Sequence, residues 1–158
     1  MLDVQTRKII LADTPKSYSG TANAKTYVSL KDYRHFRATI AVGAWAGGTA
    51  AVTLKQATAV AGTGEKALSF SKQWNDVATS GTLVETAVAS DTFNIDNTYV
   101  GKLIVIEVDA SQLDASNGFD CIALAIATPG ANADFYSVTY ELSQPRYGAA
   151  TPPTALTD

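Results

Sequence analysis

Apolar and polar residues alternate along most of the chain, which is typical of strands that bury one face. The run 35–42 carries four apolar side chains at alternate positions, with Arg37 and Thr39 between them. Successive side chains of a strand point to opposite faces, so this run predicts a half-buried strand. The same alternation recurs in the runs 50–57, 67–74 and 134–143. No stretch of eleven or more residues shows the three- and four-residue spacing of an amphipathic helix.

Two further runs are apolar on both faces and predict the most buried strands. Residues 103–106 are consecutive aliphatic residues, which is typical of a central strand covered on both sides. In the run 119–128 one face carries Ile122, Leu124 and Ile126, whereas the other carries only cysteine and alanine. The small side chains of that second face leave room for another segment to approach closely.

Turn signals separate these runs, as in an all-β protein. Glycine-rich segments at 43–49 and 62–64 and the dipeptides Asn117-Gly118 and Pro129-Gly130 lie between successive strand patterns. Short strands at this spacing predict a single antiparallel β-sandwich or barrel. We expect its core to contain the inward side chains of the strongest runs: Ile104, Ile106, Ile122, Leu124, Val138 and Tyr140.

The two ends of the chain lack this regular alternation. Residues 1–33 are predicted to be an N-terminal arm with an edge strand near 7–12, and residues 34–143 to be the β-sandwich domain. Residues 144–158 contain three of the five prolines and are predicted to be an extended C-terminal arm. Because the arms retain apolar and aromatic groups, we expect them to pack on neighbouring subunits.

Composition narrows the possible functions. The chain has 158 residues, which fits one domain, and its net charge of −3 argues against binding to a nucleic-acid backbone. With one cysteine and one histidine, it can form neither an intrachain disulfide nor a zinc site built from several Cys and His residues. The apolar patch at 9–12 is too short for a membrane span or a signal peptide. We therefore expect that the protein does not associate with a membrane and that it is made in a reducing compartment.

No catalytic, cofactor-binding or metal-binding site is predicted. His35 lies near no nucleophile motif, and Cys121 lies among apolar residues that favour a buried, inert thiol. The Asp- and Asn-rich stretches 91–97 and 109–120 do not have the spacing of an EF-hand, and turn capping explains them as well as calcium does. The segment 62–66 lacks the spacing of a phosphate-binding loop. We expect the protein not to be an enzyme.

The sequence has one local cluster of aromatic and basic residues, made up of Tyr27, Tyr33, Arg34, His35, Phe36 and Arg37. Tyrosine and arginine are enriched at protein interfaces, and the net charge disfavours nucleic acid, so a protein partner is the better interpretation than nucleic acid. A solvated strand edge is an equally good interpretation. Together with the arms, the cluster gives a set of candidate partner-binding residues: Ile9, Ile10, Leu11, Tyr33, Arg34, Arg37, Arg146, Tyr147 and Leu156.

Two stretches resemble small structural proteins of tailed-bacteriophage virions, of the head decoration (cement) type. In residues 99–126, Tyr99-Val100-Gly101 opens an apolar run, a loop at 109–119 follows, and a second apolar run comes next. In residues 48–75 a strand pattern, a Gly/Thr turn and an aromatic-ended run follow one another. The resemblance carries no functional residue over to this chain.

The resemblance implies a jelly-roll-like sandwich in a non-enzymatic virion protein. Such a subunit is made in the host cytoplasm, binds the major capsid protein or another virion protein, and stabilises the outer capsid lattice. A homo-oligomer, as a trimer or dimer, would fit the usual closed symmetry of assemblies.

Two other functions stay open. The chain can be a different virion component, such as a tail, collar or fibre-base protein. It can also be a carbohydrate-binding β-sandwich in which a tryptophan stacks on a sugar. For that role we expect Trp45, in a glycine-rich loop, to be exposed and Trp74, at a strand end, to lie in the core.

Overall fold

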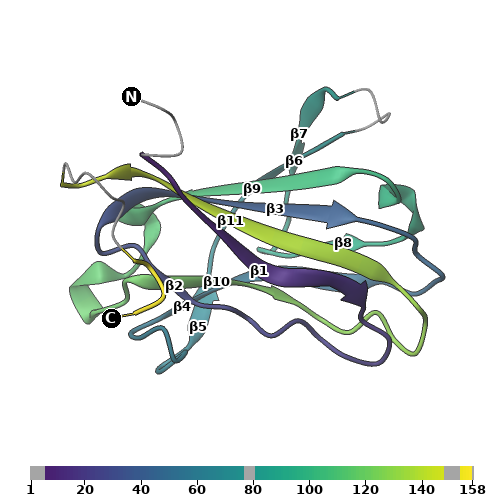
Figure 1. Ribbon diagram of the computed structural model, residues 1–158, viewed down its shortest axis with the longest axis horizontal. Coiled ribbons are helices and arrows are strands. Elements are labelled where there is room, and N and C mark those ends of the chain that lie inside the picture. Colours follow the sequence, from purple (N-terminus) through teal and green to yellow (C-terminus); the bar gives the residue numbers. More distant parts are fainter. Residues whose placement is uncertain (1–5, 77–80, 148–153, 158) are drawn as a thin grey trace.

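Two antiparallel β-sheets form the protein, as a computed structural model shows for residues 6–76, 81–147 and 154–157 (Figure 1). The first sheet has the order β1 (Lys8–Ser17), β11 (Phe135–Pro145), β3 (Tyr33–Val42), β9 (Leu103–Asp109), β6 (Lys72–Asp76) and β7 (Leu83–Ala87). The second has the order β2 (Val28–Ser29), β10 (Cys121–Ile126), β4 (Ala50–Ala57) and β5 (Lys66–Leu68), and β8 (Phe93–Ile95) also pairs with β4. Three short 3₁₀ helices follow β8 and β9: η2 (Asn97–Tyr99), η3 (Ala110–Gln112) and η4 (Ala115–Asn117). In the described ranges, no helix is long and apolar enough to cross a membrane.

Strands β5 and β8 together form one interrupted strand along β4. Leu68, the last residue of β5, pairs with Leu54, and Phe93, the first residue of β8, pairs with Val52. The two partners are only two positions apart on β4, so the line of pairing continues from β5 into β8. Residues 69–92 leave this line and return to it.

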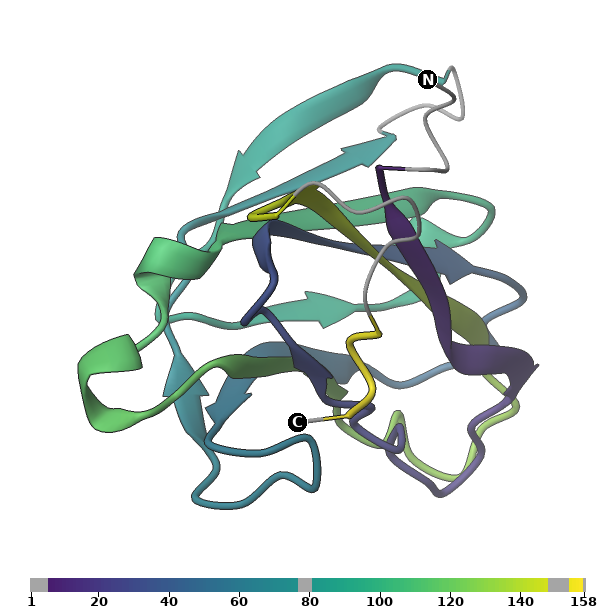
Figure 2. The same cartoon turned by 60° about the vertical axis from the view of Figure 1, so that its left-hand side comes forward.

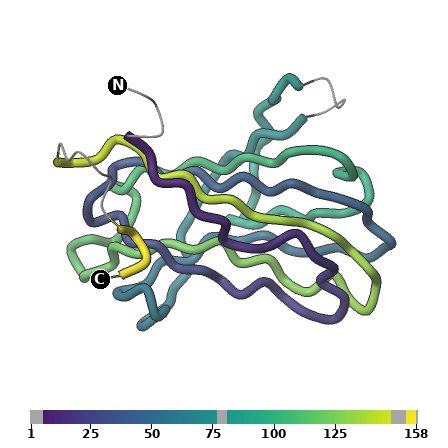
Figure 3. Tube along the Cα trace, viewed as in Figure 1, coloured from purple at the N-terminus to yellow at the C-terminus, as the bar shows by residue number. Residues whose placement is uncertain are grey.

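With β5 and β8 counted as one strand, the topology is that of an eight-stranded jelly roll. The chain crosses between the sheets at every step except from β4 to β5, which are neighbours in the second sheet (Figure 3). The first sheet then has the order β1-β11-β3-β9 and the second β2-β10-β4-β5/β8. This arrangement is the double-sheet jelly roll of Greek-key strands. The predicted all-β sandwich of jelly-roll type is confirmed.

The excursion 69–92 contains a β-hairpin that joins the other sheet. Strand β6 pairs with β9 through Trp74 and Val105, and β7 pairs with β6 along its whole length. Figure 1 shows this hairpin projecting beyond the sandwich. The sequence pattern predicted one strand over 67–74, and this is wrong. The chain turns between β5 and β6, where Asp91 accepts hydrogen bonds from the Phe70 amide and the Ser69 hydroxyl.

The core between the sheets contains all six residues that the alternation placed there. Ile104, Ile106, Ile122, Leu124, Val138 and Tyr140 are each 0% exposed and belong to one apolar cluster. Residues 103–106 were expected to be covered on both faces of the strand. This holds for Val105, which is buried and pairs with Trp74 of β6, but not for Leu103, which is 47% exposed.

The N-terminal segment is part of the sandwich from residue 8 onward. The expected edge strand is present as β1, which pairs with β11 over its length, and Ile10 and Tyr18 are buried in the core. The Tyr18 ring stacks on that of Tyr136, with centroids 3.8 Å apart. Burial, together with nearby Asp13, raises the pKa of Tyr18 to about 12. The prediction of an arm is therefore wrong for residues 8–33.

The described end of the C-terminal segment also packs on the sandwich. Strand β11 continues to Pro145, which takes the last pairing position, opposite Tyr33. Residues 148–153, with Pro152 and Pro153, lie outside the described residues. Beyond them, Ala155 is fully buried and its carbonyl accepts a hydrogen bond of 2.8 Å from the Ser29 amide, so this segment lies beside β2 (Figure 2). Residues 154–157 therefore do not form an arm that extends away from the domain.

A buried polar network completes the edge of β10. Because β2 is only two residues long, it pairs with Cys121 and Ile122 and leaves the rest of β10 without a strand on that side. Asn23 takes its place: its side chain accepts from the Ile126 amide and donates to the Leu124 carbonyl, both at 2.9 Å. It also donates to the Asp13 carboxylate of β1 at 2.9 Å, which links the two sheets.

Replacing Asn23 by alanine tests this network. The change leaves the Ile126 amide, the Leu124 carbonyl and the Asp13 carboxylate without these partners in a buried site, so we expect a loss of about 2–4 kcal/mol in the free energy of unfolding. Chemical denaturation measures this loss, with the exposed Asn94→Ala as control. Equal stability of the two variants would contradict the role given to Asn23.

The inward face of β9 gives a second test, because Ile104 is buried and its neighbour Leu103 points outward. We expect Ile104→Ala to lower the free energy of unfolding by about 2–5 kcal/mol through lost burial and the cavity left behind. Leu103→Ala should change it by less than about 1 kcal/mol. Similar denaturation midpoints for both variants would show that the faces are assigned wrongly.

Candidate functional site

A chain of ion pairs crosses the outer face of the first sheet. Arg37 of β3 lies between two carboxylates: its Nε is 2.8 Å from Glu107 Oε1 on β9, and its Nη1 is 3.7 Å from Glu141 Oε1 on β11. Arg7 pairs with Glu141 at one end of the chain, and His35 Nε2 lies 3.9 Å from Glu107 at the other. These side chains are partly exposed, so each pair adds little stability. Their effect is to hold a charged row across β11, β3 and β9, which Arg7 extends from its position just before β1.

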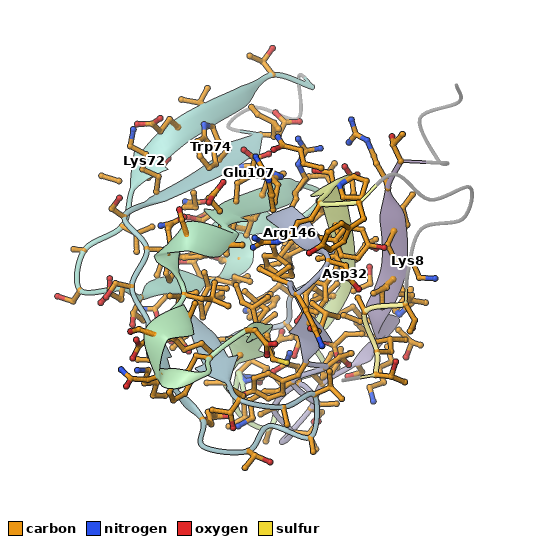
Figure 4. The ribbon with its side chains drawn as sticks, turned by 90° about the vertical axis from the view of Figure 1, so that its left-hand side faces the viewer. Lys8, Asp32, Lys72, Trp74, Glu107 and Arg146 are labelled. Atoms are coloured by element: carbon orange, nitrogen blue, oxygen red, sulfur yellow. The ribbon has the colours of Figure 1, made fainter. Side chains whose placement is uncertain are left out.

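The next row of the same face carries no charged side chain from β1 to β6. Register places Leu11, Thr139, Thr39, Val105 and Trp74 side by side across β1, β11, β3, β9 and β6. At the hairpin end a groove of about 330 Å³ opens between Trp74, Leu83 and Leu103, with Arg37 and Glu107 at its charged side. Figure 4 shows Trp74 on the same side of the molecule as Lys72 and Glu107.

The burial of the two tryptophans is the reverse of what the sequence predicted. Trp45 is 8% exposed and belongs to the core, where its Nε1 donates to the Gly48 carbonyl at 3.1 Å. Trp74 is only partly buried, because its position on β6 faces outward from the sandwich. The expectation of an exposed Trp45 and a core Trp74 is therefore wrong for both residues.

The candidate partner-binding residues do not all reach the surface. Ile10 and Tyr33 are buried in the core, so they offer no contact to a partner in this fold, and their assignment is wrong. Ile9 and Leu11 are each 56% exposed on β1 and share the outer face with Arg37.

The other candidates lie away from that face. Arg34, Arg146 and Tyr147 are exposed where β3 begins and β11 ends, and the Arg146 amide donates to the Asp32 carbonyl there (Figure 4). Leu156 is 47% exposed next to the buried Ala155. The structure thus places Ile9, Leu11 and Arg37 on one face, gathers Arg34, Arg146 and Tyr147 at another place, and leaves Leu156 apart from both groups.

Several exposed apolar residues were not among the candidates. Leu83 and Val84 on β7, Leu103 on β9 and Phe135 on β11 are each between 43% and 47% exposed. Of these, only Phe135 carried a signal in the sequence, because the alternation in 134–143 places it on the face opposite Tyr136. The exposure of β7 depends on the position of the hairpin, which no local pattern reveals.

The outer face of the second sheet is covered in part by a tyrosine, as its small side chains allow. Tyr27 packs on Cys121 and Ala123, which are both buried. The Tyr27 hydroxyl donates to Glu65, and Lys25 Nζ lies 2.7 Å from the same carboxylate. The contact with Lys25 lowers the pKa of Glu65 most, and the contact with Tyr27 lowers it further. The pKa of Tyr27 is raised, mainly by burial and then by the contact with Glu65. The predicted close approach to this face is confirmed.

Aspartates of the two acidic stretches accept hydrogen bonds within turns and short helices. Asp109 caps η3 through the Ser111 amide, and Asp96 caps η2 through the Thr98 amide, both at 2.9 Å. Hydrogen bonds from Lys66, then Asn117 and Ser116, lower the pKa of Asp114 to about 2. Within residues 6–76, 81–147 and 154–157, no group of three or more His, Cys, Asp or Glu side chains could hold a metal ion.

His35 has a serine and a carboxylate as neighbours. Its Nδ1 lies 3.3 Å from Ser143 Oγ, and Glu107 is on its other side at 3.9 Å. A nucleophile activated by histidine also needs a substrate pocket and donors for the developing oxyanion. Neither Ser143 nor His35 lines the groove beside Trp74, and both lie on regularly paired strands.

Comparisons with known proteins give remote structural likenesses. No protein-family model matches the chain, and no curated protein matches its sequence. The SPBc2 prophage-derived protein YomS is 9% identical, with 91% of this chain and 98% of that one covered and a TM-score of 0.47. The Triatoma virus capsid is 11% identical, with 98% and 95% covered and a TM-score of 0.42. The Tobacco streak virus coat protein is 6% identical, with 97% and 93% covered and a TM-score of 0.37.

These values are too low to transfer a function. The class of fold, a jelly roll, rests on the strand pairing of this chain alone.

Proposed function

We propose that the protein is a non-enzymatic structural subunit of a virion that decorates the capsid and stabilises its outer lattice. Jelly rolls serve in viral capsids and in lectins, but a fold by itself does not set function. The observation that carries the proposal is the outer face of the first sheet, where Ile9 and Leu11 are exposed on β1 and share that face with the ion-paired Arg37, on the other side of β11. Apolar contacts flanked by arginine are characteristic of protein interfaces.

This face suits a lattice partner because it is broad and held in place by strand pairing. A subunit that binds many equivalent sites needs only a modest affinity at each, since contacts between linked sites add by effective concentration. The partner in this proposal is the major capsid protein, and the protein is made in the host cytoplasm and resides in the virion. A tail, collar or fibre-base protein could use the same face, and electron microscopy of labelled particles distinguishes these locations.

Charge reversal of the apolar edge tests the proposal. We expect Ile9→Glu combined with Leu11→Glu to reduce binding to particles that lack the protein by at least tenfold, because both side chains would carry charge into the interface. Their exposure keeps the change compatible with folding. Cosedimentation with particles measures the binding.

Val100→Glu is the matched control, since Val100 is 42% exposed and lies outside strand β1. It should bind as the unchanged protein does. Full binding by the Ile9 and Leu11 variant would refute the assignment of this face. Deletion of the C-terminal segment is a poorer test, because Ala155 is part of the core and its loss mixes folding with binding.

The groove at Trp74 favours carbohydrate binding as a second candidate function. A partly exposed indole can stack on the apolar face of a sugar ring, and Arg37, Glu107 and Thr39 line the same groove as hydrogen-bonding groups. This candidate concerns the hairpin end of the sheet, away from β1.

A glycan array examines this candidate directly. If the groove binds sugars, the unchanged protein gives specific signals that Trp74→Ala abolishes and Tyr147→Ala keeps, because Tyr147 is an exposed aromatic residue outside the groove. Equal signals from the two variants, or none from the unchanged protein, would exclude it.

A further inference from the structure

The hairpin β6–β7 is not needed to close the sandwich. Strands β5 and β8 follow one line along β4, so the jelly roll has all eight strands without it. The chain enters and leaves the hairpin at neighbouring points, since the Val88 amide donates to the Ser71 carbonyl at 2.8 Å. The hairpin is therefore an appended unit, and its surface is available for a contact with another molecule.

Strand β7 is an open edge of the first sheet. All five of its residues are exposed, and Leu83 and Val84 present apolar side chains on its two opposite faces, at 46% and 45% exposure. Alternate backbone groups of an edge strand point away from its one neighbour. Within the described residues, β6 is the sole strand paired with β7.

The other sheet edges are protected in the ways that natural proteins use. Strand β1 has two register shifts and contains Pro15 and lysines at its ends, β5 is three residues long, and β2 is followed along its edge by the segment at Ala155. Strand β7 has none of these features. Its sequence, LVETA, contains no lysine or proline, and it pairs with β6 over five positions without a shift.

We propose that two copies of this protein pair through β7, antiparallel and about a two-fold axis, with Val84 opposite Val84 of the second copy. A two-fold axis perpendicular to the sheet places residues of the same face opposite each other. Centring on Glu85 would oppose two carboxylates. Centring on Val84 joins the two exposed valines on one face and places each Leu83 opposite Glu85 of the second copy on the other face, so that no two carboxylates are opposed. The two six-stranded sheets then become one continuous sheet.

The pairing is weak in dilute solution. A five-residue strand buries less than the roughly 1,200–2,000 Å² of a stable interface, so the dimer forms at high concentration or between copies that are held close together. This contact between copies does not depend on the partner in the proposed function. Failure of particle binding and failure of self-pairing are separate results.

A disulfide at the two-fold axis tests both the pairing and its register. Opposed residues of antiparallel strands have Cα atoms about 4.5 or 5.5 Å apart, and both distances allow a disulfide. Cys121 is buried, so Val84→Cys introduces the one exposed thiol. We expect mild oxidation of the concentrated protein to give a covalent dimer.

Thr86→Cys is the matched control, because it lies on the same face of β7. In the proposed register the two Thr86 positions are four residues apart along the strands, or about 13 Å, which is too far for a disulfide. Linkage through residue 86 and not through 84 would overturn the register. The absence of a dimer with Val84→Cys would overturn the pairing.

Sedimentation velocity provides an independent readout. The unchanged protein should shift from monomer towards dimer as its concentration rises, and Val84→Lys should remain monomeric because a lysine there repels its counterpart. Val100→Lys, an exposed substitution away from β7, should behave as the unchanged protein does. An unchanged protein that is monomeric at every concentration, or a Val84→Lys variant that still dimerises, would contradict the proposal. Circular dichroism verifies that each variant is folded.

Discussion

The register of β3 between β11 and β9 is the constraint on which the rest of the structure depends. Strand β3 pairs with β11 from Tyr33 to Val42 and with β9 from His35 to Ala41. Because side chains alternate with a period of two, a slip of one residue would turn Phe36 and Ile40 to solvent and Arg37 into the core. One register therefore sets both the apolar interior and the ion-paired exterior of the first sheet.

The outer surface follows from the same alternation. The carboxylates of Glu107 and Glu141 meet Arg37 because the three residues occupy one row across β9, β3 and β11. The next row carries Thr39, Val105 and Trp74, so a row of uncharged side chains lies next to the charged row. A surface built in this way is broad and fixed by backbone pairing, which suits recognition of another surface better than chemistry on a small substrate.

Alternation made most of the sandwich predictable from the sequence. The strands β3, β10 and β11 each keep an apolar inward face, β4 does so apart from Gln56, and the six predicted core residues are all buried. The partial exposure of Trp74 was not predictable, because it depends on which sheet β6 joins. The roles of Asn23 and Ala155 were equally hidden, since they complete strand edges by contacts far apart in the sequence.

The candidate site was predictable only in part, for the same reason. Ile9, Ile10 and Leu11 are consecutive, so a strand must place the middle one on the opposite face, and it is indeed buried. Tyr33 lies before the alternating part of β3, and its burial depends on the turn in which its amide donates to the Leu30 carbonyl. The exposed residues of β7 depend on the placement of the hairpin, which is a long-range property.

The hairpin and the sandwich are held together by different contacts. The sandwich has a continuous apolar core, whereas the buried side chains of β6 are Gln73 and Asn75, with Asn75 Nδ2 donating to Thr86 Oγ1 at 3.2 Å. Regions with few buried apolar contacts open locally at lower free energy than the core. The central claim is that an eight-stranded jelly roll is complete in itself and carries the hairpin as a separate unit.

Native-state hydrogen exchange of the dilute protein tests this claim most directly. The account predicts that amides of β6 and β7 exchange through local opening, at least a hundredfold faster than those of β3 and β10, which require global unfolding. Equal protection of the hairpin and the central strands would show that the hairpin is an integral part of the fold and would contradict the account.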